Sequence, residues 1–121
     1  MQLLNGTTID SKQFKRWTKA LRSGKYKQGR QALEMGGKFC CLGVACKLLI
    51  PAEDQLRLPE GSLAGGLPSS QPNAPEWLKE ISNDVAERLN NGLVRLNDKE
   101  NLTFDEIADV LELIYVHKAM D

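Results

Sequence analysis

The spacing of apolar residues predicts a helix near the start of the chain. Phe14, Trp17 and Leu21 repeat at intervals of three and four, with cationic residues on the other faces. A short side chain at residue 10 or 11 can accept from the free amides of the first turn, and Gly24 supplies the left-handed conformation that ends many helices. The pattern therefore predicts a helix between these points, preceded by a short arm.

Three later segments also have helical patterns. Residues 40–50 are apolar on most sides and are closed by Pro51, which predicts a buried helix at the centre of the core. A second segment begins with Pro75 as its first helical residue and runs to about residue 89, with an interruption at residues 82–84 left open. A third begins at Thr103, which forms a capping box with Glu106 and leaves the acidic residues of this helix facing solvent. Between them, residues 93–96 are a short apolar segment, either a strand or a helical turn.

Glycine and proline mark the remaining structure. Gly36 and Gly37 separate residues 31–35 from residues 38–41, which predicts a short β-hairpin that packs on the helices. Residues 52–74 contain three prolines and three glycines and exceed an ordinary connection, so we expect a flap. Four leucines should fold it back onto the body: Leu56, Leu58, Leu63 and Leu67. The predicted fold is a single α+β domain over residues 1–121, with about four helices around the cysteine-rich helix and one short hairpin.

The amino-acid composition excludes several classes of binding partner. Sixteen basic residues balance sixteen acidic ones, so no global field attracts nucleic acid or an anionic membrane, and a DNA mimic would need an acidic excess. No apolar stretch approaches the roughly 20 residues of a membrane span, and the first residues lack the pattern of a signal peptide. Three cysteines in an apolar setting indicate reduced thiols, as in a cytosol. We therefore expect neither a membrane nor a nucleic-acid partner.

The loop at residues 25–30 is the strongest candidate for binding. It combines an aromatic ring that can stack, an amide, a glycine that admits close approach of a ligand, and three cations for an anion. A turn at residues 97 and 98 could contact a hydroxyl or amine of the same ligand, with the 52–74 segment closing the pocket. The alternative is a purely structural role for both turns. The predicted ligand-binding residues are Lys25, Tyr26, Lys27, Gln28, Gly29, Arg30, Asn97 and Asp98.

The cysteines allow two other hypotheses. Cys40, Cys41, Cys46 and the sole histidine, His117, supply the elements of a zinc site, but adjacent cysteines do not fit the usual spacing, so we expect no metal. The run from Cys41 to Val44 faintly resembles the Cys-x-Gly-hydrophobic start of the catalytic helix in cell-wall cysteine peptidases. An alternative function is therefore a thiol hydrolase with Cys41 as nucleophile and His117 as base. Phosphate-binding loop motifs are absent from the sequence, and no cofactor is expected.

Two groups of motifs carry a resemblance. The first is Tyr26-x-Gln28-Gly29, then Leu33, then Phe39-Cys40-Cys41-Leu42-Gly43-Val44-x-Cys46. The second is Leu96-Asn97-Asp98, followed by Leu102-Thr103-Phe104-x-Glu106-Ile107-Ala108-Asp109. Together they resemble a family of small uncharacterised proteins encoded by tailed bacteriophages and prophages.

The resemblance implies a phage accessory protein in the host cytoplasm, with no catalytic residue to transfer. Phage proteins of this size commonly bind rather than catalyse. We therefore expect a non-enzymatic protein for host takeover or counter-defence that sequesters a small anion or nucleotide. An inhibitor of a host protein is the alternative, using Trp77 or the basic face of the first helix, and a homo-oligomer is left open.

Overall fold

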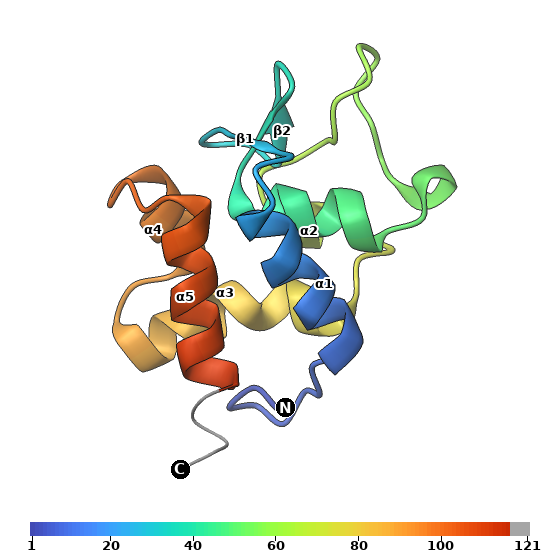
Figure 1. Ribbon diagram of the computed structural model, residues 1–121. Helices are drawn as coiled ribbons and strands as arrows, with labels where there is room; N and C mark the ends of the chain where they lie inside the picture. The colour runs from blue at the N-terminus through green and yellow to red at the C-terminus, as the bar shows by residue number, and fades with distance from the viewer. Residues whose placement is uncertain (117–121) are drawn as a thin grey trace.

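The computed structural model describes residues 1–116, which fold into five α-helices and a small three-stranded sheet (Figure 1). The helices are α1 (Ser11–Arg22), α2 (Cys41–Leu49), α3 (Glu76–Leu89), α4 (Leu93–Asp98) and α5 (Phe104–Tyr115). The strands are β1 (Lys27–Gln28), β2 (Glu34–Met35) and β3 (Lys38–Phe39). This arrangement confirms the predicted α+β class. No helix within residues 1–116 is long and apolar enough to cross a membrane.

The structure confirms the predicted start and end of α1 and the predicted start of α5. Asp10 is the N-cap of α1, and its carboxylate accepts a hydrogen bond from the amide of Gln13 at 2.9 Å. Gly24, with φ of +75°, follows the last turn of α1 in the left-handed region. Thr103 and Glu106 form the capping box that starts α5. Local side-chain chemistry therefore determines where these two helices begin.

The hairpin is present, and a third strand accompanies it. Gly36 and Gly37 both have positive φ, 59° and 78°, and join β2 to β3 in antiparallel register. Strand β1 pairs with β3 in parallel, which gives the sheet order β1-β3-β2. The sequence did not predict β1, because two residues are too few to show alternation. This pairing holds the 25–30 loop against the hairpin.

Helix α2 lies at the centre of the core, as predicted. Every residue from Cys41 to Cys46 is buried. A Cβ added to Gly43 would lie 1.8 Å from the carbonyl oxygen of Leu33, so only glycine permits the observed approach of the hairpin to the helix. On another side, the indole of Trp17 donates to the carbonyl of Cys41 at 2.9 Å. Helix α1 thus packs on α2, and its neighbouring side packs on α5.

The two helices after the long loop differ in detail from the prediction. Helix α3 runs through residues 82–84 without interruption and ends at Asn90, whose φ is 58°. Pro75 is its N-cap rather than its first residue. Residues 93–98 are helical, which decides between the strand and helix alternatives for that segment, and Asn97 and Asp98 belong to the helix instead of following it.

The side-chain amide of Gln71 holds the 52–74 segment together more than its leucines do. Gln71 is fully buried; its Nε2 donates to the carbonyls of Leu56 and Ala64, and its Oε1 accepts from the amide of Leu56. Of the four leucines expected to anchor the segment, Leu63 is buried at 1% exposure, and the other three are exposed. The prediction for those three was wrong, because hydrogen bonds to the backbone replace apolar anchoring. That the segment acts as a flap stays a prediction.

Candidate functional site

Asn97 is a fully buried amide that joins three segments of the chain. Its Oδ1 accepts from Gln28 Nε2 at 2.9 Å and from the backbone amide of Cys41 at 3.3 Å. Its Nδ2 donates to the carbonyl of Gly29 at 2.8 Å and to Asp98 at 2.9 Å. All four of these hydrogen bonds join the Asn97 amide to other groups of the protein, so the amide is engaged in internal structure.

The predicted binding residues around Asn97 lie close together, but their polar groups form hydrogen bonds within the protein. Gln28 Nε2 also donates to the carbonyl of Leu102, and Asp98 Oδ2 accepts from the backbone amide of Gln31 at 3.1 Å. Arg30 donates to Asn101 at 2.7 Å. These contacts fasten the β1 loop to α4 and to the segment before α5, which is the structural role that sequence reasoning left open for these turns.

A cavity of about 230 Å³ lies beside this network, at the N-terminus of α2. Two of the three expected regions contribute to its lining, namely residues 66–67 of the long segment and Asp98, and they are joined by residues 31–32 and Val94. The remaining wall is Cys40, Cys41 and Leu42. No residue of the 25–30 loop lines this cavity, and one carboxylate and two thiols make it a poor receptor for an anion.

The thiols in this cavity are not activated. Cys40 is the N-cap of α2, and its Sγ accepts from the amide of Gly43 at 3.3 Å. Burial nevertheless raises the pKa of Cys40 to about 11, and burial raises the pKa of the fully buried Cys41 well above its usual value. A nucleophilic cysteine needs a lowered pKa and access to substrate, so the burial of both thiols does not favour the hydrolase alternative. His117 lies outside the described residues.

Metal binding also finds no support in the part of the chain that the structure describes. The three cysteines are free and buried, and no group of three metal-ligating side chains gathers within residues 1–116. Burial raises the pKa of Cys46 to about 12, and this thiol lies further along α2, away from the cavity lining.

A second hollow, of about 250 Å³, lies between α1 and the start of the β1 loop, and we call it the α1–β1 cleft. It is lined by Arg16, Lys19, Ala20, Ser23, Lys25, Tyr26 and Leu48. Lys25 and Tyr26 were predicted as ligand contacts, while Arg16 and Lys19 were not. The turn at Gly24 places residues 25 and 26 beside the last turns of α1. This glycine is a local sequence signal from which the proximity of Arg16 and Lys19 to the loop could have been predicted.

The α1–β1 cleft combines cations with an anchored aromatic ring. Three of its lining side chains are cationic and none is acidic. Tyr26 is half-buried and packs edge-to-face on Phe39, with ring centroids 5.5 Å apart. Such packing fixes the orientation of a ring that can receive a second aromatic group. The cleft can therefore hold a ligand that has both a negative charge and a planar ring.

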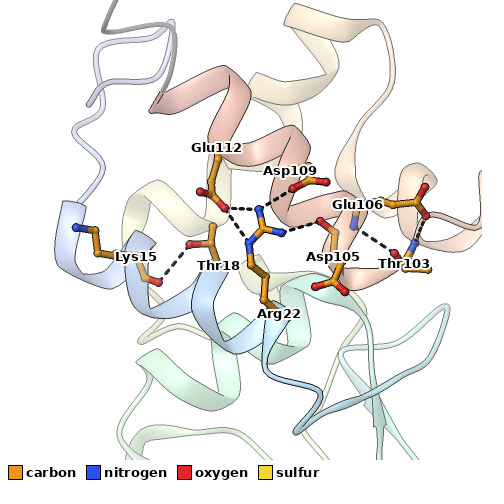
Figure 2. A network of polar contacts seen from close by, with 8 residues as sticks. All are labelled: Lys15, Thr18, Arg22, Thr103, Asp105, Glu106, Asp109 and Glu112. Atoms are coloured by element: carbon orange, nitrogen blue, oxygen red, sulfur yellow. Dashed lines mark hydrogen bonds and ion pairs between the residues drawn. The ribbon is translucent and has the colours of Figure 1, made fainter.

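The cations of α1 fall into two groups. Arg22 faces α5, where its guanidinium bonds Asp109 at 2.7 Å, Glu112 at 2.5 Å and the carbonyl of Asp105 (Figure 2). Asp109 faces solvent as expected, with 69% of its side chain exposed, and both Asp109 and the half-buried Glu112 also pair with Arg22. Arg16, Lys19 and Lys25, by contrast, make no ion pair within residues 1–116. Arg16 and Lys19 are therefore unpaired cations of α1 at the cleft, whereas Arg22 is paired on the α5 side.

Trp77 does not offer a docking surface. It is 3% exposed, and its indole donates to Gln13 at 2.9 Å. The expectation that Trp77 could anchor a protein partner was wrong, because Trp77 joins the aromatic cluster of Phe14 and Trp17. The basic face of α1 remains exposed.

Comparison with known proteins identifies one region. Residues 9–63 match the model of a family described as a domain of unknown function (DUF8296). This region is a little under half of the chain; it includes α1, the sheet and α2, and it contains every residue that lines the α1–β1 cleft. No curated protein and no solved structure matches the chain.

Proposed function

We propose that the protein is a non-enzymatic binding protein that sequesters a small anionic ligand of nucleotide type in the α1–β1 cleft. The observation that carries the proposal is the convergence of Arg16, Lys19 and Lys25 on a hollow that also exposes part of Tyr26. Cations supply the phosphate contacts, and the ring supplies a stacking surface for a base. By its resemblance to phage proteins, its role is that of an accessory protein in host takeover or counter-defence, acting in the host cytoplasm.

The cleft revises the set of binding residues. Lys25 and Tyr26 keep their predicted roles of anion contact and stacking, and Arg16 and Lys19 join them. Gln28, Gly29, Arg30, Asn97 and Asp98 are positioning residues instead, since they hold the β1 loop in place through internal hydrogen bonds. Lys27 is exposed, but it does not line the cleft.

Lys25 and Lys27 provide a matched test of this proposal. Both are exposed lysines of one loop, two residues apart, and only Lys25 lines the cleft. Binding of AMP is measured by isothermal titration calorimetry at low salt. Lys25→Glu should weaken binding by roughly tenfold or more, because it replaces an attractive charge by a repulsive one. Lys27→Glu should change it by roughly threefold or less.

The outcomes separate the proposal from its alternatives. Equal effects of the two variants would reduce the interaction to general electrostatics and reject the cleft. Retention of AMP binding by Tyr26→Leu, a variant that keeps an apolar contact with Phe39, would reject the stacking role. The alternative of a host protein partner uses the same basic face of α1. A host protein partner would be indicated if AMP did not bind, and if the wild-type protein retained a host protein that Lys25→Glu failed to retain.

A further inference from the structure

The exposed face of α1 extends the charge of the α1–β1 cleft by one helical turn. Lys12, Arg16 and Lys19 are separated by four and three residues, so they form one row along the helix. The buried residues Phe14, Trp17 and Leu21 occupy the opposite face. The row therefore points away from the core and leads from solvent into the cleft.

This row belongs to a strongly basic helix. Helix α1 contains five cations and no acidic residue. Arg22 is paired with Asp109 and Glu112 of α5 (Figure 2), and Lys15 lines a separate hollow between α1 and α5 without an ion pair among residues 1–116. Lys12, Arg16 and Lys19 have no ion-pair partner among residues 1–116.

We infer that the ligand of the cleft carries a chain of phosphates, as in a nucleoside di- or triphosphate, and this inference rests on the proposed function. Tyr26 and Leu48, which both line the cleft, receive the base. Lys25 and Lys19 contact the first phosphate, Arg16 the next, and Lys12 the terminal phosphate beyond the cleft. A monophosphate would leave Lys12 without a partner. The long side chains of the row can converge on the closely spaced charges of a polyphosphate.

AMP, ADP and ATP, titrated without magnesium at constant low ionic strength, test the inference. The dissociation constant should fall by about threefold with each added phosphate, the effect of one exposed ion pair. Lys12→Ala should weaken ATP by about threefold and leave AMP unchanged. Lys27→Ala is the matched control, because it removes an exposed lysine that neither lines the cleft nor belongs to the row, and it should leave all three affinities unchanged.

Different failures reject different claims. Binding of none of the three nucleotides rejects the proposed function and this inference with it. Equal affinities for AMP, ADP and ATP reject only the polyphosphate. Equal losses for Lys12→Ala and Lys27→Ala, or an equal loss of AMP and ATP in Lys12→Ala, reject the row as the phosphate site. Inorganic tripolyphosphate should bind more weakly than ATP, and equal binding would remove the nucleoside from the assignment.

Discussion

Replacement of Asn97 by alanine tests whether the predicted binding turn is a structural joint. The substitution removes the acceptor of the Cys41 amide, the donor to the Gly29 carbonyl and one partner of Gln28. Gln28 keeps the carbonyl of Leu102, so two backbone groups lose their only partner in the structure. An unsatisfied buried group costs about 1–3 kcal/mol, so we expect a loss of about 3 kcal/mol in the free energy of unfolding.

Such a loss is a large part of the roughly 5–15 kcal/mol by which a small domain is stable, and it should lower the melting temperature by roughly 10 °C. Urea unfolding followed by tryptophan fluorescence measures it, since both tryptophans are buried. Arg30→Ala is the control: it breaks an exposed hydrogen bond of the same loop and should cost about 0.5 kcal/mol or less. A cost below about 1 kcal/mol for Asn97→Ala would refute the structural assignment. Loss of nucleotide binding at unchanged stability would return Asn97 to the ligand site.

Three other predictions concern the core and its titrating groups. Gly43→Ala should destabilise the protein by about 2 kcal/mol or more in urea unfolding, although alanine favours helices, because the new Cβ meets the carbonyl of Leu33; a neutral or stabilising result would contradict this. The described thiols should react slowly with Ellman's reagent at pH 8 in native protein and rapidly in denaturant, since burial raises their pKa; one fast native thiol would revive the hydrolase. The pKa of Asp84 is lowered: burial raises it, but hydrogen bonds from Tyr115, the Leu4 amide and Arg88 outweigh burial. Wild type should therefore exceed Asp84→Asn in stability at pH 7, and the difference should shrink as the pH falls below the unfolded pKa of about 4; a constant difference would exclude this carboxylate as its source.

The helices were predictable because their signals are local. The capping box at Thr103 and the period of Phe14, Trp17 and Leu21 act within one or two turns of the chain, and the structure confirms both elements. The Gly36–Gly37 turn is similarly local, because it depends only on two residues that accept positive φ. In each case the physical cause lies inside the segment that the pattern describes.

The candidate site was predictable only in part, because its contacts join distant segments. Asn97 meets Gln28 and Gly29 across almost seventy residues, and nothing near Asn97 in the sequence distinguishes such a joint from an exposed turn. The residues of the 25–30 loop were therefore identified together, although they divide in the structure. Lys25 and Tyr26 line the cleft, and the following residues hold the loop to α4.

The zero net charge of the chain gives no indication of the local row of unpaired cations on which both proposals depend. Helix α5 neutralises Arg22 and leaves the row from Lys12 to Lys19 without ion-pair partners within residues 1–116, so local and global charge differ. The same arrangement limits the size of an anionic ligand. Asp109 and Glu112 lie on the α5 side of the row, and a long polyanion that extended across that side would meet their carboxylates. Since repulsion from these groups grows with the length of the ligand, the distribution of charge favours a short phosphate chain over a nucleic-acid strand.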